Sequence, residues 1–148
     1  MTALAHTGFT VRDLDRSLAF YRDVLGMEVV FEQEKQGGYL VAIVGYPDAH
    51  VRMAHLAFAG GGHRIELFQY LSPAGRGEAS EPRDVGITHV CLAVDDIDAV
   101  FGRVVAAGAD PVSDPVLVDT GANAGGRGVY VRDPDGIVVE LFQPPEAR

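Results

Sequence analysis

An internal repeat constrains the fold of this chain more than any other feature of its sequence. The segment RIELFQ at residues 64–69 recurs as VVELFQ at residues 138–143. Alternation along a strand places Glu140 on the same face as the apolar Phe142, where an unpaired charge is unfavourable. Glu66 takes the same place in the first copy. Because this unusual position is used twice, we expect the two glutamates to share a function.

The repeat extends over the rest of both halves of the chain. The string HTGFTVRDLDRSLAFYRDVLG starts at His6, and HVCLAVDDIDAVFGRVVAAG starts at His89. In this alignment Asp13 matches Asp96, and each aspartate stands where a helix would begin. Each half is therefore predicted to form a strand, a helix and two to four further strands.

Periodicity and turn residues divide each half into elements. Alternation of apolar and polar residues indicates strands, and apolar positions three to four residues apart indicate helices. In the first half we predict a strand over residues 4–11, a helix from Asp13 or Asp15 to Gly26, and strands over 28–33, 39–44, 51–58 and 64–70. In the second half we predict a strand over 87–94, a helix over 96–107, a short strand near 111–118, a loop over 121–128, and strands over 129–132 and around Glu140.

We predict an α+β fold in a single domain over residues 1–148. The first βαβββ module spans residues 1–71 and the second spans residues 87–145. Residues 72–86, which are polar and rich in Gly and Pro, form the linker between them. Neither module alone would bury its sheet well. We therefore expect the two modules to combine into one curved, cup-shaped mixed sheet with the helices outside.

Composition excludes several functions. The formal net charge of −9 argues against a nucleic-acid surface, which needs clustered Lys and Arg. No apolar run reaches the length of a membrane span, and the N-terminus lacks the pattern of a signal peptide, so we expect a cytoplasmic protein that does not bind membranes. Cys91 is the only cysteine. An internal disulfide is therefore impossible, and any metal would be held by His and carboxylate groups.

The repeat would bring four polar side chains together. If the modules are related by a pseudo-twofold axis, equivalent residues converge across that axis. The residues that would then meet in the cup are His6, Glu66, His89 and Glu140.

The chain resembles the vicinal oxygen chelate superfamily. This group includes glyoxalase I, methylmalonyl-CoA epimerase, extradiol dioxygenases, and fosfomycin and bleomycin resistance proteins. The resemblance covers nearly the whole chain. It is carried by His6 with LDRSLAFYRDVLG, the IELF segment, His89 with VDDIDA, and the ending RDPDGIVVELFQP.

The resemblance implies a metal site. In metal-dependent members, the first-strand histidine and the last-strand carboxylate of each module are the ligands, which correspond here to His6, Glu66, His89 and Glu140. Two imidazoles and two carboxylates suit one divalent ion of Ni, Co, Mn, Fe or Zn in a six-coordinate site. The competing interpretation is that Arg64 pairs with Glu66 and that the histidines only satisfy hydrogen bonds. A matched His/Glu pair that occurs twice favours metal ligation.

The implied activity is that of a metal-dependent isomerase or lyase of the glyoxalase I or epimerase type. Such an enzyme transfers a proton next to a carbonyl through a metal-bound enediolate or enolate. Glu140 is our candidate for the base, and Glu66 is the second acid or base, because reprotonation from the other side needs a symmetric partner. The substrate would be a small molecule with adjacent oxygens.

Two other functions remain open. An extradiol-type dioxygenase resembles this pattern but leaves the fourth ligand position empty, so Glu66 argues against it. An antibiotic-binding or resistance protein would sequester a drug in the cup, but members without metal lose the ligands. The superfamily also predicts a homodimer, in which the cup is built either within one chain or across the dimer.

Several other side chains are expected near the cup. Phe68, Phe142 and Tyr130 would line its wall, and Cys91 would share a face with His89, where a packing role is favoured over chemistry. Arg64, Arg127 and Arg132 flank the same strands and are candidate substrate contacts. Three further histidines have no partner in the repeat and are not ligand candidates: His50, His55 and His63.

Overall fold

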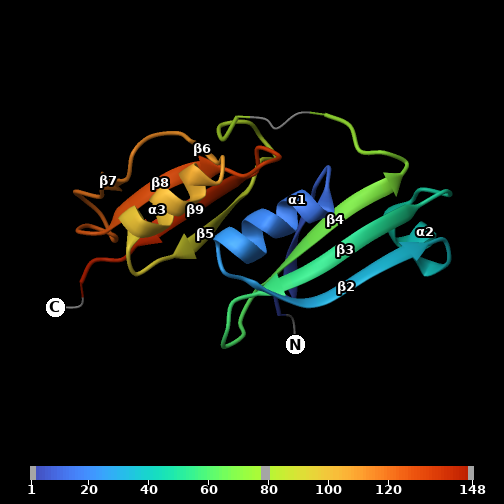
Figure 1. Ribbon diagram of the computed structural model, residues 1–148. Coiled ribbons are helices and arrows are strands. Elements are labelled where there is room, and N and C mark those ends of the chain that lie inside the picture. Colours follow the sequence, from blue (N-terminus) through green and yellow to red (C-terminus); the bar gives the residue numbers. More distant parts are fainter. Residues whose placement is uncertain (1–2, 78–80, 147–148) are drawn as a thin grey trace. The chain divides into compact units, whose positions relative to one another are not determined.

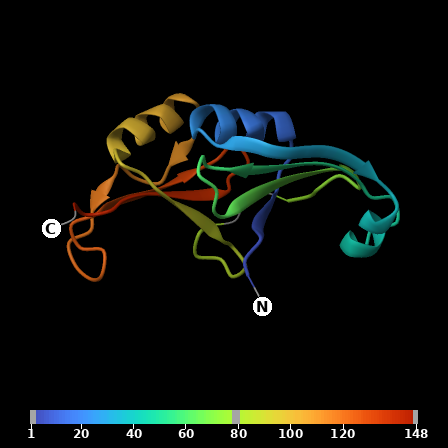
Figure 2. The same cartoon turned by 90° about the horizontal axis from the view of Figure 1, so that it is seen from below.

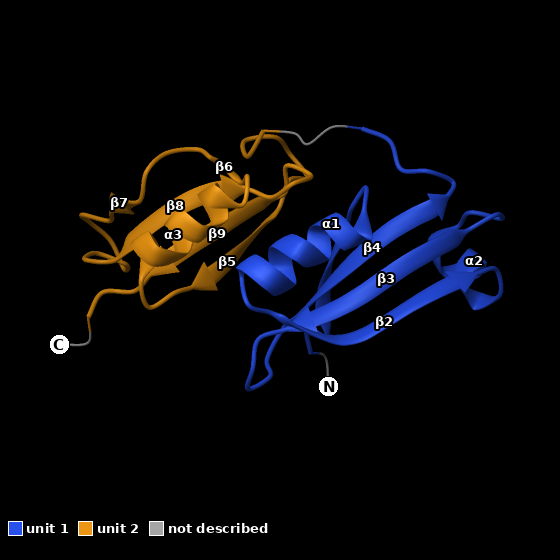
Figure 3. Ribbon diagram, in the orientation of Figure 1, with its two compact units in different colours: residues 1–77 blue, residues 78–148 orange. Residues whose placement is uncertain are grey.

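The computed structural model describes residues 3–77 and 81–146 (Figure 1). The chain divides into two compact units, residues 1–77 and residues 78–148 (Figure 3). The division falls within the segment 72–86 that we expected as a linker, and residues 78–80 of that segment lie outside the described residues. Among the described residues, no helix is long and apolar enough to cross a membrane.

The first unit contains one sheet and three helical segments. Its elements are β1 (His6–Thr10), α1 (Leu14–Leu18), the π-helical segment η1 (Ala19–Val24), β2 (Glu28–Gln36), α2 (Tyr39–Val44), β3 (His50–Ala57) and β4 (Arg64–Ser72). The four strands lie in the order β1-β4-β3-β2. Strand β1 runs parallel to β4, and the other pairs are antiparallel.

The second unit repeats this plan with shorter strands. Its elements are β5 (His89–Ala93), α3 (Ile97–Ala106), β6 (Asp110–Pro111), β7 (Val116–Leu117), β8 (Arg127–Arg132) and β9 (Val138–Gln143). The sheet has the order β5-β9-β8-β6, and β7 also pairs with β8. Strand β5 is parallel to β9, as β1 is to β4. The predicted α+β class is confirmed, and the described strands form two mixed sheets, one in each unit.

One predicted element is wrong: residues 39–44 form helix α2 and not a strand. The run YLVAIV is apolar and rich in β-branched residues, a composition that favours strands. Two features override that preference. Gly45 ends the helix in the left-handed conformation at φ 78°, and Leu40 packs against the buried residues Val51 and Met53 of β3. Tertiary packing therefore decides this segment.

A helix covers one face of each sheet and leaves the other face for the glutamates. Figure 2 shows α1 lying along the sheet of the first unit and α3 lying along the sheet of the second. The fully buried residues include Leu14 of α1 with Leu56 and Leu67 of the first sheet, and Val104 of α3 with Leu141 of the second sheet. Strand alternation places the glutamates on the opposite side. We call this side of each sheet its glutamate face.

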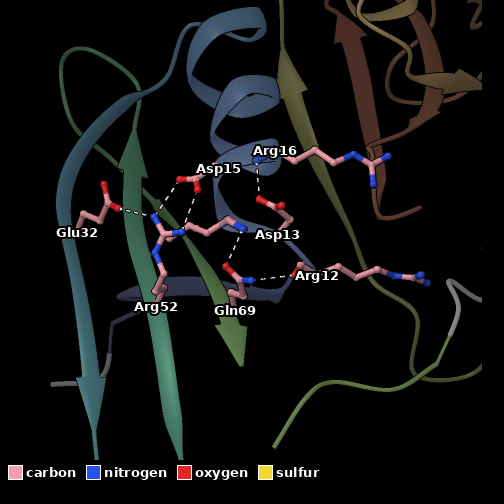
Figure 4. Close-up of polar contacts among 8 residues, drawn as sticks. Arg12, Asp13, Asp15, Arg16, Glu32, Arg52 and Gln69 are labelled. Atoms are coloured by element: carbon pink, nitrogen blue, oxygen red, sulfur yellow. Dashed lines mark hydrogen bonds and ion pairs between the residues drawn. The ribbon is translucent and has the colours of Figure 1, made fainter. Parts of the chain in front are cut away.

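The start of α1 is fixed by side chains that accept its free backbone N–H groups. Asp13 is the N-cap, and its carboxylate accepts a hydrogen bond of 3.0 Å from the N–H of Arg16. The amide oxygen of Gln69 on β4 accepts from the N–H of Leu14 at 3.0 Å, and its NH₂ donates to the carbonyl of Arg12 at 3.0 Å (Figure 4). The last residue of the RIELFQ motif therefore ties the helix to the sheet.

The start of α3 in the second unit is fixed in the same way. Asp96 caps α3 by accepting from the N–H of Ala99 at 3.0 Å. The side chain of Gln143, at the end of the second motif copy, accepts from the N–H of Ile97 at 2.9 Å. The predicted helix starts are confirmed, and the glutamine of each motif has a structural role.

An arginine of the sheet also pairs with an aspartate in the first turn of α1 and of α3. Arg52 on β3 donates two hydrogen bonds to Asp15 in the first turn of α1, at 2.9 and 3.0 Å (Figure 4). Arg127 on β8 pairs with Asp98 in the first turn of α3 in the same way. In both pairs the hydrogen bonds between the side chains lower the pKa of the aspartate.

Candidate functional site

The glutamate face of the first unit brings the predicted His6 and Glu66 together. They lie on the neighbouring parallel strands β1 and β4, and the Nε2 of His6 is 3.4 Å from the Oε2 of Glu66. Gly8 stands directly opposite Glu66 in the strand register. A Cβ built on Gly8 would lie 3.4 Å from Oε2, so the absence of a side chain leaves the carboxylate free space on that side.

The second unit contains the matching pair. The Nε2 of His89 on β5 lies 3.3 Å from the Oε2 of Glu140 on β9. The two distances and the two pairs of atoms agree, so the sequence repeat is also a repeat of side-chain geometry. Among the described residues, no group of three or more His, Cys, Asp and Glu side chains is arranged to hold a metal ion.

Glu66 has a second histidine neighbour, His55, which was not among the ligand candidates predicted from the sequence. His55 on β3 lies directly opposite Glu66 on β4, and its Nε2 is 3.1 Å from the Oε1 of Glu66. Its ring meets those of His6 and Phe31 edge to face, with centroids 5.3 and 5.9 Å apart. The repeat gives no hint of this residue, because the signal lies in the pairing register of β3 with β4.

Tyr130 holds the place of His55 in the second unit. It lies opposite Glu140 in the register of β8 with β9, and its ring centroid is 5.1 Å from that of His89. Partial burial, followed by the charge of Glu140, raises the pKa of the phenol, so Tyr130 stays neutral.

Cys91 stands opposite Glu140 in the strand register, where the first unit has Gly8. Cys91 is an exposed residue. Partial burial of its thiol raises the pKa to about 11, and the charge of Glu140 and a hydrogen bond to Glu140 add to the rise. The thiol is therefore protonated at neutral pH, and it is a poor nucleophile and metal ligand.

The two predicted aromatic wall residues differ in their surroundings. Phe68 packs against Tyr70, with ring centroids 5.1 Å apart, and joins the apolar cluster beneath α2. Phe142 lies against the backbone of the buried Gly126, where an added Cβ would come within 2.9 Å of the ring. Both rings are partly buried on the glutamate faces of their own sheets.

The candidate arginines divide into two groups. Arg64 is exposed beside His6 in the strand register and, within the described residues, forms no ion pair with Glu66, whose partners are His6 and His55. The alternative in which Arg64 neutralises Glu66 is therefore not realised. Arg127 clamps the start of α3, and Arg132 pairs with Glu81 at 3.0 Å. These two arginines have structural roles in the second unit.

Comparison with known proteins places the chain in a family. It belongs to the Glyoxalase/Bleomycin resistance protein/Dioxygenase superfamily, whose model matches residues 3–141. The resemblance seen in the motifs is thus confirmed.

Similar proteins have names that point to lyases and isomerases. The chain is 31% identical to a 2-epi-5-epi-valiolone epimerase from Actinomyces, over 97% of this chain and 80% of that protein. It is 32% identical to a probable lactoylglutathione lyase from Vibrio parahaemolyticus, over 97% of this chain and 92% of that protein.

Solved structures share the fold. A glyoxalase family protein from Bacillus cereus superimposes with a TM-score of 0.87 at 23% identity, covering 98% of this chain and 95% of that one. The trypanothione-dependent glyoxalase I from Leishmania major superimposes with a TM-score of 0.66 at 20% identity, covering 97% of this chain and 87% of that one.

Proposed function

We propose that this protein is a metal-dependent enzyme of the glyoxalase I or epimerase type, which transfers a proton at a carbon next to a carbonyl. The names of its relatives support the lyase or isomerase class. The observation that carries the proposal is the matched pair of a histidine and a glutamate in each unit, at 3.4 and 3.3 Å. The substrate would be a small molecule with adjacent oxygens.

The spacing within the pairs fits two ligands of one cation better than a direct hydrogen bond. Charge-assisted hydrogen bonds between nitrogen and oxygen span about 2.7–2.9 Å. Elsewhere in this chain, His50 and Glu34 form such a bond at 2.6 Å. Two neighbouring ligands, each about 2.1 Å from one ion, stand about 3.0–3.4 Å apart when the angle between them is about 90–110°. Both candidate pairs are close to that range.

We therefore propose that His6, Glu66, His89 and Glu140 together hold one ion of Ni, Co, Mn, Fe or Zn. Two imidazoles and two carboxylates suit these metals. Residues 1–148 would then act as one domain, since each unit supplies half of the ligands. When bound, the cation would supply Lewis acidity that stabilises negative charge on the substrate oxygens.

We assign the proton transfer to the two glutamates. Glu140 takes the proton from the carbon, and the electron pair of the broken C–H bond moves to the neighbouring carbonyl oxygen. Its side chain is 25% exposed against 17% for Glu66, which makes it the more accessible carboxylate. An epimerisation also needs an acid on the opposite face of the same carbon, and we assign this role to Glu66.

We further propose that the active form is a cytoplasmic homodimer. The support for a dimer is the edge strand β2, which exposes the apolar side chains of Val30 and Phe31. Edge strands of this kind are common sites of association between chains.

Elemental analysis tests the metal proposal. The purified protein should contain about one divalent ion per site, lose it to a chelator and regain it when metal is added back. His89→Ala and Glu140→Gln should each bind far less metal, because each removes one ligand. His50→Gln, on β3, is the control that should keep full metal content. Full content in the two ligand variants would contradict the assignment.

Isotope exchange tests the reaction. In deuterium oxide, the metal-loaded protein should introduce deuterium at the carbon next to the carbonyl of its substrate, and Glu140→Gln should abolish the exchange. The first substrates to try are those implied by the names of the relatives, a lactoylglutathione precursor and 2-epi-5-epi-valiolone. A protein that binds no divalent metal under any condition would instead support the drug-binding alternative.

A further inference from the structure

We infer that His55 is a positioning residue that fixes the orientation of the Glu66 carboxylate. This inference rests on the proposed metal site, because it concerns how one of the proposed ligands is held. His55 has no counterpart in the repeat, since Tyr130 stands at the corresponding place in the second unit.

The two oxygens of Glu66 have different neighbours. Oε1 lies 3.1 Å from the Nε2 of His55, whereas Oε2 lies 3.4 Å from the Nε2 of His6. A contact with His55 on one oxygen leaves the other oxygen directed toward His6. Glu66 can then present a single oxygen, in a fixed direction, on the side where His6 presents its nitrogen.

The one printed polar contact of the His55 ring is directed at Glu66. Its Nε2 faces the Oε1 of Glu66 at 3.1 Å. Its Nδ1, on the other side of the ring, is buried and has no hydrogen-bond partner among the described residues. The ring therefore meets the carboxylate through Nε2, from the strand that neighbours β4.

Packing holds the ring of His55 in place. Its side chain is only 18% exposed, and its ring lies edge to face with those of His6 and Phe31. Strand β3 is paired on both edges, with β2 and β4. A rigid support of this kind is what metal ligands commonly receive from residues behind them.

The second unit lacks this support. Tyr130 contacts the ring of His89, and within the described residues it makes no hydrogen bond to Glu140. Glu140 has the thiol of Cys91 as its neighbour instead. The two glutamates are therefore unequal. Glu66 has the imidazole of His55 beside it, whereas Glu140 has the thiol of Cys91.

The affinity for Co²⁺ alone, measured by competition with a chromophoric chelator, tests the inference. We expect His55→Leu to weaken binding by about 10- to 100-fold, which is the usual effect of removing such a support. His55→Gln should recover most of the affinity, because its amide can place an N–H group where the Nε2 of histidine was. His50→Gln is the matched control on the same strand and should bind like the unmodified protein.

The outcomes separate the two proposals. If Glu66→Gln and Glu140→Gln lose Co²⁺ but His55→Leu binds it normally, the role of His55 is refuted and the metal site stands. If the unmodified protein binds no Co²⁺, both proposals fail. Far-UV circular dichroism of His55→Leu and His55→Gln reports whether each is folded. Equal losses in these two variants, both folded, would show that His55 acts only through packing, which also overturns the inference.

Discussion

At the scale of single residues, the surroundings of equivalent positions make the two halves chemically different. Gly8 and Cys91 both stand opposite the glutamate of their unit, and His55 and Tyr130 do so on its other side. The first unit thus surrounds its glutamate with the imidazoles of His6 and His55, whereas the neighbours of Glu140 are the imidazole of His89, a thiol and a phenol. Both of these acids have a raised pKa and remain neutral beside their glutamate.

The raised pKa of the Cys91 thiol can be tested by alkylation. A pKa of about 11 for Cys91, against the usual 9.0 of a thiol, predicts a thiolate fraction about 100-fold lower than that of an ordinary thiol near neutral pH. Alkylation by iodoacetamide at pH 8 should therefore be slow in the native protein and fast in urea. An equal rate in both conditions would show that the thiol is not perturbed.

The same shift affects stability at high pH. The native state keeps the proton of Cys91 at pH values where the unfolded state has lost it. The contribution of this group is therefore fully present below pH 9.0 and is lost as the pH rises toward about 11. Unfolding in urea across this window, compared between the unmodified protein and Cys91→Ala, would measure the contribution.

At the scale of elements, α1 and α3 are fixed by the same three interactions, two of which join the helix to its sheet. An aspartate caps the helix, a second aspartate pairs with an arginine, and the glutamine of the repeated motif accepts a backbone N–H. The motif therefore carries two functions. Its glutamate faces the candidate site, and its glutamine, three residues later, holds the helix on the other face.

The glutamine contact predicts a measurable loss of stability. Gln69→Ala leaves the N–H of the fully buried Leu14 without its acceptor, which should reduce the free energy of unfolding by about 1–3 kcal/mol. Urea denaturation would measure the change. Asp23→Asn, which removes an exposed ion pair with Arg22, is the control and should leave the stability unchanged. Equal effects of the two variants would contradict the role of Gln69.

At the scale of the whole molecule, the proposed metal site would make both halves of the chain necessary for one function. Each unit presents one histidine and one glutamate, which is half of the proposed ligand set. A cation that binds the native state alone stabilises it by about 2.7 kcal/mol when its concentration is 100 times the Kd. The stabilising effect should therefore depend equally on ligands from either unit.

Thermal unfolding with and without Ni²⁺ tests this dependence. We expect the metal to raise Tm, and we expect His6→Ala in the first unit and His89→Ala in the second to abolish the increase to the same extent. If only one of the two variants lost the increase, the ion would be bound by one unit alone. The proposal of a shared site would then be wrong.

The amino-acid sequence alone predicts the α+β class, the repeat, the helix starts and the matching of a histidine with a glutamate in each half. These features depend on local periodicity and capping residues, or on a pattern that occurs twice, and both kinds of signal can be read along one chain. His6 and Glu66 were found because His89 and Glu140 repeat them.

The remaining features became visible only in the folded protein. Residues 39–44 fold into a helix, because Leu40 finds a buried site on β3 that outweighs the strand preference of the segment. His55 lies beside Glu66, and Arg127 pairs with Asp98. Each of these contacts depends on the register between strands, or on packing between elements, that are distant in the sequence. No local pattern encodes such a contact, so it appears only when the chain is folded.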